Sequence, residues 1–470
     1  MRIALQPADV VAGGDVTPGT TATTTVAAPV SSSPPQVPFG KQMRALFEFH
    51  PNYTPLNHGS YGTFPAAVRK FREASLHEHE ERPDTFRRFT QPEIIKKSRA
   101  AVAPLLGADV HVDEVVFQLN ATTGVNTVVH NLAGKWSASA GDAVLHFTTI
   151  YGACRKTLLS LEEFGRLRTV EIHMAFPDDS DDDLDAKLRA THAHAVEQGL
   201  KPRLVVIDTI VSGPGVLMPW QRLVATAREL GMQSLIDGAH GIGQIDLTEL
   251  GSIKPDFFVT NLHKWLFVPR GCALLYVPFR NQHQITTGLP TSWGYQLPGE
   301  RDPSRYFPDL FADLGTSDMS PYACVETAMA FRRDVCGGEA TIREYCVWLA
   351  KEGGDRAAAI LGTYVMDNPN SNIRQCNFAN VRLPLTIKPD AEIASDDSTS
   401  IPLSCVAEVA DWIQMRGVLE GDTYLQAMFY NGIFWTRFSS QIYLDIADFE
   451  WGARQLVSYC ERVKAGEWKK

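Results

Sequence analysis

Lys264 stands between His263 and Trp265, in a stretch, 261–265, that follows an apolar segment, 256–260, typical of a buried strand. Lysine is almost never fully buried unless it is paired or used chemically. A desolvated lysine has a lowered pKa and attacks aldehydes to form a Schiff base. Considered alone, the segment fits a lysine that extends to the surface better than a reactive one. The residues described next favour the reactive lysine.

Asp237 follows the apolar residues Leu235 and Ile236 and precedes the short sequence Gly-Ala-His240. A carboxylate at the end of a buried strand is the partner that pyridoxal phosphate (PLP) needs. The ring of this aldehyde cofactor withdraws electrons while its nitrogen is protonated, and a fixed carboxylate keeps the proton there. His240 would then reach the phenolic oxygen of the ring. The alternative is an aspartate that caps the next turn.

Residues 120–126, Asn-Ala-Thr-Thr-Gly-Val-Asn, follow a predicted strand and open a predicted helix. Backbone N–H groups at the helix N-terminus, together with the hydroxyls of Thr122 and Thr123, would hold a phosphate. The alternative is an ordinary N-cap. The glycine and lysine pattern of a P-loop is absent.

Tyr151 and Arg437 are candidates for contacts with a substrate. Tyr151 follows the predicted strand 143–147, and it would place its ring over the cofactor with its hydroxyl toward the substrate. Arg437, on a predicted strand within 435–443, carries a guanidinium that can grip a carboxylate with two hydrogen bonds. The alternatives are packing at the core or rim for Tyr151 and a structural salt bridge for Arg437.

Short apolar strands alternate with helices from residue 115 onward, which predicts an α/β fold whose mostly parallel sheet is covered by helices on both faces. Ligands bind beyond the carboxyl ends of such strands. We expect a disordered tail over residues 1–37, an N-terminal segment and large cofactor-binding domain over 38–335, and a smaller α+β domain over 336–470. Residues 387–403, rich in Pro, Asp and Ser, are predicted to form a surface loop.

The composition of the 470 residues is that of an ordinary soluble protein, with 44% hydrophobic and 21% charged residues. A net charge of −10 argues against nucleic acid as a partner. No apolar run predicts a membrane span, no targeting peptide is recognisable, and the eight cysteines are scattered, so we expect a cytoplasmic enzyme with reduced thiols. No metal site is predicted. The acidic run 178–183 lacks the glycine of an EF-hand and predicts the start of a helix over 184–196.

Six motifs occur in the order found in class V aminotransferase-like proteins, which are PLP enzymes of fold type I, and the sequence resembles this family over most of its length. Asn57, His58 and Gly59, together with Tyr151, are most similar to its isopenicillin-N-epimerase-like branch. That branch includes the fungal hercynylcysteine sulfoxide lyases of ergothioneine biosynthesis. The motifs are Leu56-Asn-His-Gly-Ser, Ala121-Thr-Thr-Gly-Val-Asn126, Asp237-Gly-Ala-His240, His263-Lys264, Leu314-Gly-Thr-Ser-Asp318 and Arg437-Phe-Ser-Ser-Gln-Ile-Tyr443.

The resemblance implies a large domain with a seven-stranded sheet and a role for each matching residue. Lys264 would be the Schiff-base lysine, Asp237 the partner of the ring nitrogen, and Arg437 the ligand of the substrate carboxylate. The sites would be shared across an interface, so a homodimer is implied. The other matches would be Thr122, Thr123 and His263 for the phosphate, Thr316 for the phosphate of the neighbouring protomer, and Asn57 and His58 for the substrate.

Together with the resemblance, these residues lead to the expectation of a PLP-dependent lyase that cleaves the C–S bond of a cysteine S-conjugate by β-elimination, and the resemblance implies hercynylcysteine sulfoxide as this substrate. The products would be a sulfenate or thiol, pyruvate and ammonia. Lys264 would remove the Cα proton, and Tyr151 would protonate the departing sulfur group or its oxygen. Trp293 and Tyr295 are interpreted as core residues in the first place. The alternative is that they offer an aromatic face to the trimethylammonium group of this substrate.

Three other functions are weighed against the lyase. Epimerisation, or another Cα transformation in secondary metabolism, would use the same cofactor without releasing pyruvate. A catalytically silent scaffold would have kept only the fold. Desulfurase activity is not expected, because Cys376 and Cys405 lack the small-residue motif around the persulfide-forming cysteine of those enzymes.

Overall fold

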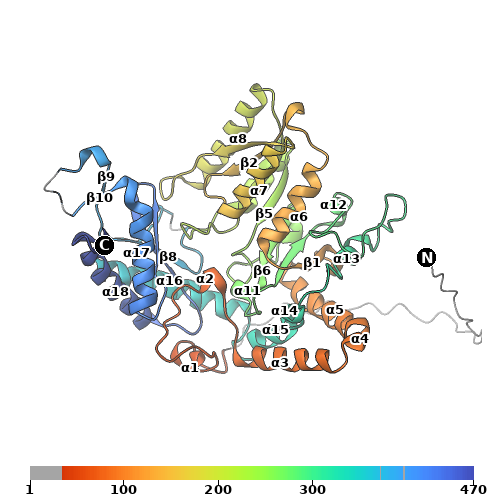
Figure 1. Ribbon diagram of the computed structural model, residues 1–470, viewed down its shortest axis with the longest axis horizontal. Coiled ribbons are helices and arrows are strands. Elements are labelled where there is room, and N and C mark those ends of the chain that lie inside the picture. Colours follow the sequence, from red (N-terminus) through yellow and green to blue (C-terminus); the bar gives the residue numbers. More distant parts are fainter. Residues whose placement is uncertain (1–33, 371, 395–396, 398, 470) are drawn as a thin grey trace, which may run out of the picture. The chain divides into compact units, whose positions relative to one another are not determined.

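A seven-stranded sheet forms the centre of the large domain (Figure 1). The computed structural model describes residues 34–370, 372–394, 397 and 399–469. The strands are β1 (Val115–Gln118), β2 (Asp142–Phe147), β3 (Arg168–Ile172), β4 (Lys201–Asp208), β5 (Gln233–Asp237), β6 (Phe257–Asn261) and β7 (Ala273–Tyr276). Their order is β1-β7-β6-β5-β4-β2-β3, and only β7 runs against its neighbours. The predicted mostly parallel seven-stranded sheet is confirmed.

Helices cover both faces of this sheet. On one face α6 (Ala121–Ala133) and α7 (Gly152–Glu163) share an apolar core with Leu204 and Val206 of β4. On the other face α8 (Asp181–Glu197) and α9 (Trp220–Glu229) share a core with Val205 and Ile207. Both faces of β4 are therefore buried, which explains why these residues are apolar without alternation.

A group of helices from the start and the middle of the chain adds to the second face. Residues of α3 (Ala66–Glu81), α5 (Gln91–Val102) and α15 (Val325–Asp334) belong to the same apolar core as β4. The remaining helices of the large domain are short. They are α1 (Lys41–Arg44), α2 (His58–Tyr61), α4 (Pro83–Thr85), α10 (Leu250–Ile253), α11 (Leu262–Trp265), α12 (Phe279–Gln282), α13 (Tyr306–Leu310) and α14 (Ser320–Ala323).

The smaller C-terminal domain is built on a second sheet. Its antiparallel strands are β8 (Phe378–Arg382), β11 (Gln426–Tyr430) and β12 (Ile433–Ser439), in the order β11-β12-β8. Its helices are α16 (Glu339–Leu361), α17 (Val406–Glu420) and α18 (Ile446–Lys464). Within 387–403 a short parallel pair forms between β9 (Ile387–Lys388) and β10 (Ile401–Pro402). The smaller α+β domain is confirmed, whereas the division after residue 335 stays a proposal.

β3 is not predicted from the sequence. It is an edge strand whose first four residues are exposed or half-buried, so it lacks a continuous apolar run. Residues 1–33 of the predicted tail lie outside the described residues. Among the residues that are described, no helix is long and apolar enough to cross a membrane, and no three metal-binding side chains gather as a metal site would require.

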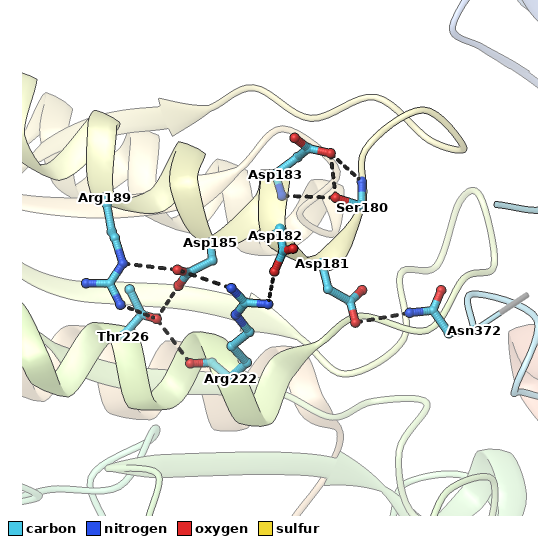
Figure 2. A network of polar contacts seen from close by, with 9 residues as sticks. All are labelled: Ser180, Asp181, Asp182, Asp183, Asp185, Arg189, Arg222, Thr226 and Asn372. Atoms are coloured by element: carbon cyan, nitrogen blue, oxygen red, sulfur yellow. Dashed lines mark hydrogen bonds and ion pairs between the residues drawn. The ribbon is translucent and has the colours of Figure 1, made fainter. Parts of the chain in front are cut away.

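The acidic run is the start of α8, as predicted (Figure 2). The Ser180 hydroxyl accepts a hydrogen bond from the Asp183 backbone N–H at 3.2 Å, and the Asp183 carboxylate accepts one from the Ser180 N–H at 2.9 Å. This capping box satisfies two N–H groups at the start of the helix. Arg222 of α9 pairs with the carboxylates of Asp182 and Asp185. The run is thus part of the surface that joins α8 to α9.

Candidate active site

The carboxyl ends of β4, β5 and β6 bring three polar side chains to one edge of the sheet. Asp208 and Asp237 end β4 and β5 as paired residues, and Asn261 ends β6. The Asn261 side-chain oxygen accepts a hydrogen bond from the Ala121 N–H at 2.8 Å. This bond fixes the start of α6 beside the strand that leads into α11, which carries Lys264.

Lys264 is half-buried, and its Nζ lies 3.0 Å from Nε2 of His240. Burial lowers the pKa of Lys264 to about 8, against the opposing influence of the Asp237 carboxylate. A substantial fraction of the amine is therefore neutral near pH 8, which is the form that attacks an aldehyde or removes a proton.

Asp237 is only 3% exposed. One carboxylate oxygen accepts a hydrogen bond from the Ala239 N–H at 3.0 Å, and the other accepts one from the Cys154 thiol at 3.6 Å. Burial raises the pKa of Asp237 and, more strongly, that of the neighbouring Asp208. A cationic partner would restore the charge on Asp237, and the protonated ring nitrogen of PLP is such a partner. Cys154 and Asp208 were not predicted as site residues.

His240 lies between the side chains of Lys264 and Trp265. The indole Nε1–H of Trp265 donates to Nδ1 of His240 at 3.2 Å. Burial, followed by the charge on Lys264, lowers the pKa of His240 well below its usual value, so its ring is neutral. The third neighbour of the ring is Phe378 of β8, with centroids 5.2 Å apart. Sequence reasoning treated Trp265 only as a neighbour of Lys264.

The start of α6 has the form of an anion site. Asn120 caps the helix, since its side-chain oxygen accepts hydrogen bonds from the Thr123 N–H at 2.8 Å and from the Thr123 hydroxyl at 3.1 Å. The Thr122 side chain is half-buried and makes no hydrogen bond with any described residue. Gly124 permits close approach to the sheet, because a Cβ there would lie 2.6 Å from Val259 Cγ1. The helix terminus and the Thr122 hydroxyl thus fit a phosphate.

His263, the remaining predicted phosphate ligand, is held by the backbone. Its Nδ1 lies 2.8 Å from the carbonyl oxygen of Cys272, so Nδ1 carries a proton that it donates to this carbonyl. Burial lowers the pKa of His263 to about 4. Its Nε2 would donate to a phosphate only after the ring takes up a second proton, which a phosphate dianion favours.

Arg437 on β12 is a buried guanidinium without a counter-ion. It is 3% exposed, and none of the carboxylates that the structure describes forms a salt bridge with it. Its Nη2 donates to Asn57 Oδ1 and to Ser60 Oγ, both at 3.2 Å, and its Nη1 donates to the Ser212 carbonyl. Nε is buried and has no partner among the described residues. The alternative of a structural salt bridge therefore finds no partner here, and burial lowers the pKa of Arg437 to about 10.

Asn57 and His58 lie at the start of α2, but their surroundings differ. Asn57 holds Arg437, as described, and also accepts a hydrogen bond from the Ser60 hydroxyl at 2.8 Å. His58 Nδ1 lies 2.5 Å from the Tyr443 hydroxyl, and burial lowers the pKa of His58 to about 3. Its Nε2 is buried without a partner among the described residues. Asn57 therefore helps to hold the guanidinium of Arg437 in place. His58 is a neutral ring packed against the Trp265 ring, with centroids 5.0 Å apart.

Tyr151 and Arg437 line the same cleft, whose walls also include Tyr61, Ser212, Gln426 and Tyr430. Tyr151 is 48% exposed, so it lies at the rim of this cleft rather than in the core.

Trp293, Tyr295 and Thr316 are not among the residues that line the cleft. Trp293 is 97% exposed, so core packing is wrong for this residue. The Tyr295 ring already has the Arg301 guanidinium 5.7 Å from its centroid, which leaves it a poor face for a second cation. Thr316 lies in the exposed segment between α13 and α14.

Taken together, the residues fit PLP. A lysine with a lowered pKa, a buried carboxylate and a helix N-terminus with the Thr122 hydroxyl lie at the same edge of the sheet, which matches the aldehyde, the ring nitrogen and the phosphate of that cofactor. Lys264, Asp237 and Thr122 would be the main contacts. His240 would contact the phenolic oxygen.

Known proteins are similar to this chain over most of its length. Residues 67–291 match the family Aminotransferase class-V. The L-cysteine desulfhydrase-like protein lolT1 of Epichloe uncinata is 36% identical over 449 residues, which cover 91% of this chain and 97% of that protein. The hercynylcysteine sulfoxide lyase of Schizosaccharomyces pombe is 30% identical over 429 residues, which cover 90% and 98%.

A solved structure shares the fold. The cystine C-S lyase C-DES, in complex with its reaction product cysteine persulfide, matches with a TM-score of 0.66 at 18% identity, over 87% of this chain and 98% of C-DES. Another structure of C-DES has glycine covalently linked to its PLP cofactor. The chain therefore belongs to the class V aminotransferase family of PLP-dependent enzymes, among its C–S lyase and cysteine desulfhydrase-like members.

Proposed function

We propose that the protein is a PLP-dependent lyase that cleaves the C–S bond of a cysteine S-conjugate by β-elimination, with hercynylcysteine sulfoxide as the substrate in ergothioneine biosynthesis. The observation that carries the substrate class, an amino acid, is the buried Arg437, which has no carboxylate partner among the described residues and acts on the charge of Lys264. The reaction class is supported by the C–S lyase and cysteine desulfhydrase-like relatives. An amino acid substrate supplies the carboxylate that Arg437 lacks. The substrate itself is supported by the 30% identity to the lyase of Schizosaccharomyces pombe.

Arg437 would bind and orient the substrate carboxylate. Asn57 and Ser60 accept hydrogen bonds from Nη2, and the Ser212 carbonyl accepts one from Nη1, so the guanidinium plane is fixed before the substrate arrives. The ring of Phe378 supports the guanidinium from one side, with its centroid 4.5 Å from the guanidinium carbon. A fixed guanidinium loses little freedom on binding and therefore discriminates strongly in favour of amino acids.

Proton transfer at Cα would fall to Lys264. When bound, PLP supplies an electron sink for the charge that develops at Cα. The Nζ of Lys264 takes the Cα proton, which requires its neutral form, and burial provides that form by lowering the pKa to about 8. Asp237 is held by the Ala239 N–H and would pair as a carboxylate with the protonated ring nitrogen. The Tyr151 hydroxyl, at the rim of the same cleft, donates a proton to the departing sulfur or its oxygen.

No cysteine thiol is needed for this reaction. Cys376, whose thiol interacts with the charge of Arg437, is fully buried, and burial raises its pKa to about 11. A protonated, inaccessible thiol is a poor nucleophile. The sulfur would therefore leave with the small-molecule product rather than as a persulfide on Cys376.

The proposed function includes a homodimeric assembly and a cytoplasmic location. The exposed Thr316 would bind the phosphate of a neighbouring protomer, so the active form would be a homodimer that shares its sites in the cytoplasm. Neither nucleic acid nor a membrane would be a partner.

A pyruvate assay tests the reaction. The purified protein with PLP should release equimolar pyruvate and ammonia from hercynylcysteine sulfoxide, and more slowly from a simple cysteine S-oxide. An Arg437→Met variant should show a raised KM for both. Exchange of the Cα proton with solvent without pyruvate release would contradict the lyase and favour epimerisation or another Cα transformation.

A further inference from the structure

The hydrogen bonds around His240 determine which of its two ring nitrogens carries the proton. An indole Nε1–H can only donate, so Trp265 must donate to a lone pair on His240 Nδ1, 3.2 Å away. A neutral imidazole carries one proton, and burial keeps this ring neutral. The proton of His240 therefore lies on Nε2, the nitrogen that faces Lys264 Nζ at 3.0 Å.

This arrangement selects one form of the lysine amine. An ammonium group has only N–H donors, and it would face the N–H of His240 in an unfavourable contact. A neutral amine has a lone pair that accepts the hydrogen bond. We propose that Trp265 is a positioning residue that fixes His240 as the Nε2–H tautomer, so that His240 donates to Lys264 and favours its neutral, nucleophilic amine. This inference rests on the proposed role of Lys264.

Burial is the largest influence on the pKa of Lys264 and lowers it, in the same direction as this hydrogen bond. Among the charged groups, the carboxyls of Asp237 and Asp208 and the thiol of Cys154 raise this pKa, and Arg437 lowers it. Without the indole N–H, His240 would be free to place its proton on Nδ1 and offer the Nε2 lone pair to an ammonium group. Loss of one N–H would thus reverse the direction of a hydrogen bond at Lys264.

Competitive acetylation of the cofactor-free protein tests this, because the pH at which Lys264 becomes half-reactive can be read by mass spectrometry without any lyase activity. Trp265→Phe keeps an aromatic ring and removes the N–H, and the midpoint for Lys264 should rise by about one pH unit. Trp220→Phe is the matched control, since the Trp220 indole N–H is buried without a partner among the described residues. Its midpoint should equal that of the native protein.

A second measurement reads the tautomer of His240 in the native protein. Nitrogen-15 NMR of histidine-labelled native protein distinguishes the tautomers by chemical shift, with the His240 signals assigned from their absence in His240→Gln. We expect a protonated Nε2 and an unprotonated Nδ1. The opposite tautomer, or equal Lys264 midpoints in Trp265→Phe and native protein, would overturn the inference. Absence of pyruvate release would instead overturn the proposed function, whatever these two experiments show.

Discussion

The charged surface around α8 and the cleft around Arg437 differ in how they accommodate arginine. At the surface, Arg189 and Arg222 both pair with Asp185, and Arg222 also reaches Asp182 (Figure 2). In the cleft, Arg437 is buried with no carboxylate partner among the described residues. Each of the two surface guanidiniums therefore has at least one carboxylate partner, whereas the buried guanidinium of Arg437 has none among the described residues.

This contrast separates structural polar groups from functional ones. Exposed ion pairs stabilise a fold by about 0–1 kcal/mol each, whereas a buried charge without a partner costs several kcal/mol. The surface network therefore contributes to joining α8 and α9. The cleft keeps a destabilising arrangement that becomes favourable only when an anion binds, which is the behaviour expected of a substrate site.

Replacement of Arg437 by Met should give the largest difference between the two regions. The value of kcat/KM for a cysteine S-conjugate should fall by about 100–1000-fold, because a buried guanidinium–carboxylate pair is worth about 2–5 kcal/mol. The thermal unfolding midpoint should stay unchanged or rise, since a buried charge without a counter-ion is removed. Arg222→Met is the matched control at the surface and should leave kcat/KM unchanged. An equal loss of activity in both variants would remove the distinction.

Asp237 and Asp208 offer a sharper contrast within the cleft. Asp237→Asn should lower kcat by about 100-fold or more, because the ring nitrogen of PLP loses its counter-charge. Burial and the charge of Asp237 raise the pKa of Asp208 well above its usual value, and more strongly than burial raises that of Asp237, so Asp208 is less suited than Asp237 to supply a negative charge. Asp208→Asn should therefore change kcat by less than about threefold. A comparable loss in the two variants, measured at pH 7 with saturating PLP, would contradict this assignment.

Cofactor uptake should depend on pH through Lys264. Only the neutral amine attacks an aldehyde, and burial lowers the pKa of Lys264 to about 8. The rate of PLP uptake by cofactor-free protein should rise with pH up to about 8, and fall about tenfold for each unit below it. Stopped-flow absorbance measures this rate. If the rate kept rising to pH 10, Lys264 would be titrating like an exposed lysine.

The smallest expected effect belongs to the surface network. Ser180→Ala removes one half of the capping box of α8 and should lower the free energy of unfolding by about 1 kcal/mol. The steady-state constants should not change, because the box lies outside the cleft. Denaturant titration together with the pyruvate assay measures both. A change in KM would show that the two regions are coupled.

Sequence reasoning singled out the candidate residues that lie at or shortly after the end of a strand. Asp237 and Lys264 were singled out because strands buried on both faces leave a continuous apolar pattern, which β5 and β6 show. The acidic start of α8 was found because Ser and Asp at a helix start satisfy its free N–H groups.

The residues that were missed act through tertiary contacts. Cys154 reaches Asp237 from α7, and Trp265 reaches His240 across the turn that carries Lys264, and neither contact has a local sequence pattern. Asp208 ends its strand as Asp237 does, so this position was a signal that could have been used. Trp293 was misjudged because a large aromatic residue is usually buried, whereas here it is almost fully exposed.

The most direct test of the account is a visible absorption spectrum of the protein with PLP, followed by addition of hercynylcysteine sulfoxide and assay of pyruvate. The account predicts a cofactor band in the native protein that is lost in Lys264→Ala, and pyruvate release by the native protein alone. A native protein that shows no band after incubation with PLP, or a Lys264→Ala variant that releases pyruvate at the native rate, would contradict the assignment of Lys264.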